Sequence, residues 1–124
     1  MENSVPPHIL IVEGDNQNAL WLKHYFQDKG YVVSIVINSR DGIHVLNTQS
    51  ISGVLVSLDD AEENRMDFLN YARTYFPDVT VYAMSQELNS ESIEGSFEEG
   101  VKGFLPKPIL YDRLQEVLFE FQRL

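Results

Sequence analysis

Short apolar, β-branched runs alternate with longer amphipathic stretches along the whole chain, and this alternation limits the possible folds more than any other feature. Successive runs begin roughly two dozen residues apart, the length of one strand, one helix and two loops. Each run is continuously apolar, which is typical of strands covered on both faces in a parallel sheet. The expected strands are 8–12, 31–37, 53–58, 79–84 and 101–105.

The stretches between these runs place apolar residues at helical spacing, and residues that favour turns mark their ends. Gly30 follows the first stretch as a left-handed stop, Asn64 is placed to cap the third, and Pro77 follows it. With right-handed crossovers, the predicted fold class is α/β, a five-stranded doubly wound parallel sheet with five helices. The expected helices are 16–29, 40–48, 65–76, 90–99 and 110–124.

Composition narrows the function classes. A chain of 124 residues predicts a single domain over 1–124. Nineteen acidic against nine basic residues give a net charge of -10, which argues against binding nucleic acid directly or an anionic membrane. The absence of cysteine excludes disulfides and thiol nucleophiles and suits a cytoplasmic protein. The acidic residues concentrate in 57–99, as a solvated face or as a surface for a basic partner.

Polar residues follow four of the expected strands at the point where each strand ends. Because the carboxyl ends of parallel strands meet at one edge of a sheet, we expect these side chains to converge. Clustered carboxylates indicate a hard divalent cation such as Mg²⁺, and a lysine opposite them pairs with a carboxylate or with a bound phosphoryl group. The residues are Glu13, Asp15, Asp59, Asp60, Ser85 and Lys107.

Three segments carry a family resemblance: 9–15 (ILIVEGD), 29–33 (KGYVV) and 100–108 (GVKGFLPKP). The last is similar to a G-A-x-x-[YF]-[LV]-x-K-P ending, with Val101 in place of alanine. On these segments the chain resembles, over essentially its whole length, the receiver domain of bacterial two-component response regulators. The resemblance implies a flavodoxin-like sheet of strand order 2-1-3-4-5 and a function in phosphorelay signal transduction.

The resemblance also implies roles for single residues. Lys107 matches the lysine that binds the phosphoryl oxygens, with a cis bond to Pro108, and Ser85 matches the hydroxyl that hydrogen-bonds the phosphoryl group. Phe104 matches an aromatic switch that packs inward once Ser85 is recruited. The expected phosphoacceptor is Asp59, and the expected metal ligands for Mg²⁺ are Glu13, Asp15 and Asp59.

The implied partners are proteins. A sensor histidine kinase or a phosphotransfer protein would supply the phosphoryl group, and a homodimer would form through the fourth helix, the fifth strand and the fifth helix. The domain is not expected to be an enzyme beyond catalysing its own phosphotransfer and dephosphorylation.

The chain departs from the family pattern in ways that leave alternatives open. Gly14 stands where the family usually has its second acid. Counting back from Met66 and Asp67 favours Asp60 as the acceptor, and counting forward from the third strand reaches Leu58. The segment 60–65 lacks the usual M-P, and the glycine of M-D-G is replaced by Phe68. The alternative function is therefore a phosphorylation-independent pseudo-receiver that acts as a protein-interaction module.

A flavin carrier or a small enzyme on the same fold is a third hypothesis, and the sequence disfavours it. The loop 13–16 offers carboxylates, which repel phosphate, where a phosphate-binding loop needs Ser, Thr and Gly. The sequence contains no G-x-G-x-x-G, P-loop or G-x-S-x-G motif. The three histidines, His8, His24 and His44, fall in different elements and are not expected to act as ligands.

Overall fold

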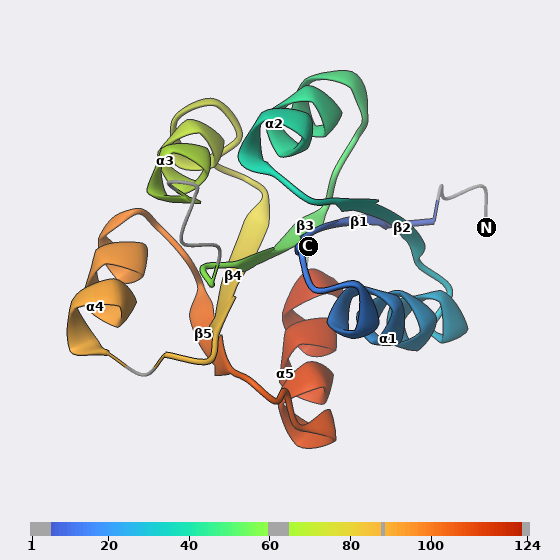
Figure 1. The fold of residues 1–124 in the computed structure, drawn as a ribbon. Coiled ribbons are helices and arrows are strands. Elements are labelled where there is room, and N and C mark those ends of the chain that lie inside the picture. The colour runs from blue at the N-terminus through green and yellow to red at the C-terminus, as the bar shows by residue number, and fades with distance from the viewer. Residues whose placement is uncertain (1–5, 60–64, 88, 123–124) are drawn as a thin grey trace.

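A computed structural model describes residues 6–59, 65–87 and 89–122 and shows a parallel sheet flanked by helices (Figure 1). Five strands lie in the order β2-β1-β3-β4-β5. This confirms the predicted fold class and strand order. The strands are β1 His8–Val12, β2 Val32–Val36, β3 Gly53–Ser57, β4 Thr80–Ser85 and β5 Gly103–Pro106. The helices are α1 Asn16–Asp28, α2 Ser39–Thr48, α3 Arg65–Tyr75, α4 Ser90–Glu98 and α5 Tyr111–Gln122.

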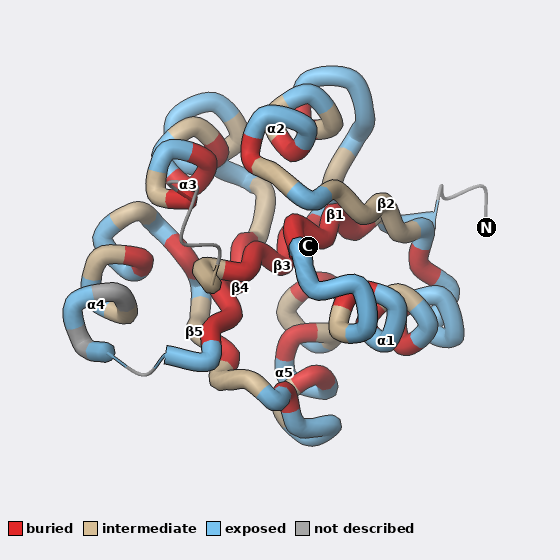
Figure 2. The backbone as a smooth tube through the Cα atoms, in the orientation of Figure 1, coloured by how far each residue is buried: buried red, intermediate tan, exposed pale blue. Residues whose placement is uncertain are grey.

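Helices cover both faces of the sheet, with α1 and α5 on one face and α2, α3 and α4 on the other (Figure 1). Successive residues of a strand point to opposite faces, so Ile9 and Ile11 join the cluster beneath α1 and α5 while Leu10 and Val12 join the other. Figure 2 shows that the central strands are buried along their length. Both faces need apolar residues, which explains the continuous apolar runs.

The helix ends follow local backbone chemistry. Gly30 has a φ of +91° just after α1, as predicted for a left-handed stop, and Gly100 has the same φ after α4. The expected cap of the third helix, Asn64, lies outside the described residues. Among the described residues, no helix is long and apolar enough to cross a membrane.

The strand register determines which residues meet at the carboxyl edge of the sheet. Val12 of β1 pairs with Val56 of β3, so Glu13 and Ser57 are the next residues along these two strands. Ser57 in turn pairs with Met84 of β4, which places Ser85 one residue further on. Ser85 pairs with Pro106 of β5, immediately before Lys107. Four neighbouring strands thus deliver polar side chains to one place.

Candidate functional site

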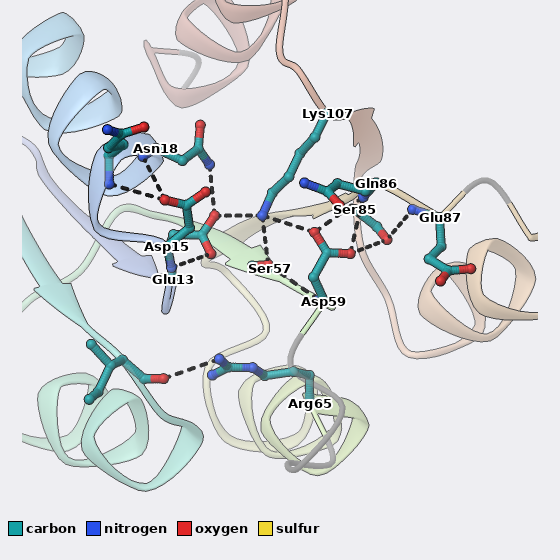
Figure 3. A network of polar contacts seen from close by, with 12 residues as sticks. Glu13, Asp15, Asn18, Ser57, Asp59, Arg65, Ser85, Gln86, Glu87 and Lys107 are labelled. Carbon is teal, nitrogen blue, oxygen red and sulfur yellow. Dashed lines mark hydrogen bonds and ion pairs between the residues drawn. The ribbon is translucent and has the colours of Figure 1, made fainter.

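The ammonium group of Lys107 lies at the centre of this edge, between two carboxylates (Figure 3). Its Nζ atom is 2.7 Å from Glu13 Oε1 and 3.0 Å from Asp59 Oδ2. It also donates a hydrogen bond of 3.0 Å to Ser57 Oγ. The side chain is only 7% exposed. An ammonium group has three N–H donors, so these three contacts use all of them.

The backbone around Lys107 holds the side chain in this position. The amide N–H of Lys107 donates a 2.9 Å hydrogen bond to the carbonyl of Ser85, which ties the end of β5 to the end of β4. The Lys107–Pro108 peptide bond is cis, as predicted. The predicted convergence of Lys107 with Glu13, Asp59 and Ser85 is therefore present in the structure.

Glu13 is a buried carboxylate, and both of its oxygens have partners. Its side chain is 3% exposed. Oε1 accepts from Lys107 and from the side-chain amide of Asn18, the latter at 2.7 Å. Oε2 accepts from the backbone N–H of Asp15 at 3.1 Å. Glu13 thus connects Lys107 to the loop and first turn of α1.

Asp59 is also fully engaged, but its partners come from β4 and the segment after it. Oδ1 accepts from the Ser85 hydroxyl at 2.6 Å and from the Gln86 N–H at 3.0 Å. Oδ2 lies 3.2 Å from the same N–H, in addition to its ion pair with Lys107. Burial alone raises the pKa of Asp59, but the hydrogen bonds from Ser85, Lys107 and Gln86 outweigh it and hold the pKa below its ordinary value. The carboxylate is therefore ionised at neutral pH.

Asp15 lines the same cavity as Glu13 and Asp59, but its carboxylate is engaged at the start of α1. Its Oδ1 accepts from the N–H groups of Gln17 and Asn18, at 3.1 and 3.4 Å, which makes Asp15 the N-cap of α1. The predicted metal ligands Glu13, Asp15 and Asp59 are therefore not assembled around one position. The correction has a simple physical reason: the orphan N–H groups of a helix start compete for the same carboxylate.

The donor set does not fit the predicted Mg²⁺. Gly14 contributes no side chain, and Glu13 and Asp59 are both bound to Lys107. Among the described residues, no group of three or more His, Asp or Glu side chains is placed to hold a metal ion. The alternative acceptor Asp60 lies outside those residues. Leu58, the other alternative, has an apolar side chain that packs against the core cluster beneath α2 and α3.

Sequence reasoning missed three groups of this site: the Ser57 hydroxyl, the Gln86 N–H and Arg65. The apolar run predicted a strand that continues to Leu58, whereas β3 ends at Ser57, so the Ser57 hydroxyl was not expected at the strand end. Arg65, at the start of α3, is 3% exposed and donates a 3.1 Å hydrogen bond to the carbonyl of Ile37. It lines the same cavity as Lys107 and Asp59, whose volume is about 350 Å³. A single arginine after an acidic loop carries no sequence signal for this position.

Phe104, the predicted switch residue, is half-buried. It packs against the core cluster that contains Val81, Ala83 and Val101. Its backbone carbonyl accepts a 3.1 Å hydrogen bond from the guanidinium of Arg113 in α5. The aromatic residue of β5 is thus turned toward the core on the side of the sheet covered by α2, α3 and α4.

Comparison with known proteins identifies the family of this arrangement. The family model of the response regulator receiver domain matches residues 9–119. The curated relatives include the transcriptional regulatory protein ZraR of Klebsiella oxytoca, 24% identical over 112 residues. The same protein of Salmonella typhimurium is 24% identical over 110 residues. These matches cover 90% and 89% of the chain but only 25% of each relative, so the chain spans about a quarter of their length.

Solved structures share the fold at low sequence identity. A CheY-like receiver domain protein from Methanospirillum hungatei superposes with a TM-score of 0.88 at 19% identity, covering 94% of both chains. The receiver domain of the TMAO respiratory system response regulator TorR gives a TM-score of 0.83 at 22% identity, covering 94% of this chain and all of the other. With the match over residues 9–119, the chain belongs to the response regulator receiver domains of two-component signalling.

Proposed function

We propose that this chain is a receiver-type interaction module whose partner-binding surface does not depend on phosphorylation. The family interacts with histidine kinases or phosphotransfer proteins, and we propose the same two classes as its partners. The observation that supports a phosphorylation-independent role is the state of the site: each of the two carboxylates that meet Lys107 already accepts from three donors of the chain itself.

Phosphoryl transfer to an aspartate needs a nucleophilic oxygen and cations that offset the charge on the transferred group. The two oxygens of Asp59 already accept from three donors, and the Gln86 N–H is shared between them. The three N–H donors of Lys107 are used on Glu13, Asp59 and Ser57. Receiver domains generally bind Mg²⁺ in the acidic pocket, but here the third carboxylate is Asp15, which caps α1. The Lys107 ammonium is thus committed to groups of the chain, and Arg65, the other cation that lines the described cavity, donates to the carbonyl of Ile37.

The second candidate function is the phosphoacceptor role of Asp59, and one observation favours it. The carboxylate lies against Lys107 and Ser85, the two residues expected to bind phosphoryl oxygens, and it is ionised at neutral pH. In that role Asp59 would first have to release Ser85 and the Gln86 N–H. The donor would be a phosphohistidine of a sensor kinase or phosphotransfer protein, or a small phosphodonor.

Incubation with acetyl phosphate and Mg²⁺, followed by intact-protein mass spectrometry, distinguishes the two functions. We expect no mass increase in a sample that circular dichroism shows to be folded, while an active receiver domain treated in parallel does gain a phosphoryl group. A mass increase that disappears in Asp59→Asn or in Asp60→Asn would overturn the proposed function and identify the acceptor.

The proposal includes the assembly and the location of the protein. Phe97 of α4 and Phe119 of α5 are 47% and 62% exposed, which supports a homodimer through α4, β5 and α5. Light scattering coupled to gel filtration tests the dimer, with Phe119→Ser expected to shift the mass to that of a monomer. The absence of cysteine supports a cytoplasmic location, and the net charge of -10 argues against direct binding to nucleic acid.

A further inference from the structure

Three donors converge on Asp59: the Lys107 ammonium, the Ser85 hydroxyl and the Gln86 N–H. Two of them, Lys107 and Ser85, are the groups expected to hold the oxygens of a phosphoryl group. Both belong to buried side chains, at 7% and 2% exposure, so this is a built anion site and not a loose surface contact. The anion it holds is a carboxylate of the chain itself.

The position of Asp59 in the chain explains how its carboxylate reaches this site. The last residue of β3 is Ser57, whose hydroxyl lies 3.0 Å from Lys107 Nζ. Asp59 comes two residues later, and its own N–H donates back to Ser57 Oγ at 3.3 Å. The chain therefore turns back over the end of the strand. Asp59 Oδ2 and Ser57 Oγ each lie 3.0 Å from Lys107 Nζ, so the carboxylate lies beside the end of the strand.

Two contacts of the site are of the kind expected of a phosphorylated receiver. Ser85 is bound to the anion through a 2.6 Å hydrogen bond. Phe104 is packed against the core cluster of Val81, Ala83 and Val101. The Ser85 hydroxyl also accepts from the Glu87 N–H at 3.0 Å, which connects the anion site to the segment that leads into α4.

We propose that the Asp59 carboxylate is an internal substitute for a phosphoryl group, which holds Ser85 and Phe104 in the signalling conformation without modification. This inference rests on the proposed function, a receiver that acts without phosphorylation. It adds that the site under Asp59 is a latent site for a tetrahedral oxyanion. Removing the carboxylate exposes Lys107, Ser85 and the Gln86 N–H to solution anions, since all three lose an acceptor.

The test compares the wild-type chain with Asp59→Ala, Asp59→Asn and Asp78→Asn. Asp78 is an exposed aspartate between α3 and β4, so Asp78→Asn makes the same change of charge at the opposite edge of the sheet. Each protein is titrated with inorganic phosphate while the amide signals of Ser85, Gln86, Glu87 and Lys107 and the ring signals of Phe104 are followed by NMR. Asp59→Asn retains an acceptor oxygen and most of the side-chain volume, so it reports on the charge alone.

In Asp59→Ala we expect the Phe104 ring and the Glu87 amide to shift without phosphate and to return toward their wild-type positions as phosphate binds. The variant should bind phosphate at least about tenfold more tightly than the wild type, a difference of about 1.4 kcal/mol. The signals of Asp78→Asn should match those of the wild type. In Asp59→Asn the Phe104 ring signals should shift in the same direction as in Asp59→Ala, but by less.

The inference is overturned if Asp59→Ala binds phosphate no better than the wild type, or if its Phe104 signals remain unchanged. If Asp59→Ala does not fold, unchanged Phe104 signals in Asp59→Asn overturn it instead. Failure of the proposed function gives a different result, a phosphoryl group on the wild-type chain after treatment with acetyl phosphate. The two failures are therefore distinguishable.

Discussion

Glu13 and Asp59 both contact the ammonium group of Lys107, yet they differ in burial and in the elements that hold them. Glu13 is 3% exposed and is connected to the first turn of α1 through Asn18. Asp59 is 22% exposed and is connected to the end of β4 and the following segment through Ser85. The lysine therefore joins one carboxylate belonging to the rigid body of the domain to one belonging to the region expected to switch.

Because of this difference, we expect the two carboxylates of one ion-pair network to affect different properties, the stability of the fold and the signalling conformation. Loss of the Glu13 contact leaves polar groups buried without partners, which is costly for folding. Loss of the Asp59 contact leaves groups that water can reach, because the Asp59 side chain is 22% exposed. We expect the Glu13 side to determine stability and the Asp59 side to determine the conformation of the segment before α4.

Removal of the shared cation should have the largest effect. Lys107→Met leaves two carboxylates without their common partner, and breaking a buried pair from one side costs about 3–5 kcal/mol. Urea unfolding followed by circular dichroism measures the loss. Lys102→Met is the matched control, because Lys102 is 51% exposed in a 3.6 Å pair with Glu120 and should change stability by less than about 1 kcal/mol. Equal effects of the two substitutions would contradict a central role for Lys107.

Glu13→Gln should be the next most destabilising change. Glutamine retains one acceptor oxygen but removes the charge from a 2.7 Å contact with Lys107, and hydrogen bonds to charged groups contribute about 1.5–3 kcal/mol. The same urea experiment should show a larger loss for Glu13→Gln than for Asp59→Asn. The reverse order would show that the more exposed carboxylate carries more of the stability.

The pH dependence of stability should show whether Asp59 stabilises the fold as an anion. Its pKa is lower in the folded state than in the unfolded chain, so its contribution is complete above the ordinary aspartate pKa of about 3.9 and is lost as the pH falls toward the folded value. Urea midpoints of the wild type should therefore fall more steeply below pH 4 than those of Asp59→Asn. Parallel curves for the two proteins would show that Asp59 is not stabilised as an anion.

The smallest effect is expected at Asp15. Asparagine caps helices about as well as aspartate, so Asp15→Asn should change the free energy of unfolding by less than about 0.5 kcal/mol. Addition of Mg²⁺ should raise the melting temperature of neither protein, because Asp15 is directed at the N–H groups of α1. A rise in the wild type that is absent from Asp15→Asn would show instead that Asp15 turns to bind the metal.

The fold and three of the site residues, Glu13, Ser85 and Lys107, could be predicted from the sequence. Continuous apolar runs and the stop at Gly30 are local signals, and parallel strands necessarily bring Glu13, Ser85 and Lys107 to one edge. The pattern left both roles open for Asp15, because a cap and a metal ligand require the same carboxylate at the same position. Ser57 was hidden because Leu58 prolongs the apolar run by one residue beyond the end of β3.

Gly14 has a consequence for the evolution and engineering of this domain. A Cβ atom added there would meet no other atom within 4 Å, and the backbone φ of this residue is not positive. The backbone at residue 14 could therefore carry a side chain without changing its conformation. The second acid of the family pattern is thus one substitution away, and the space beside residue 14 is open to it.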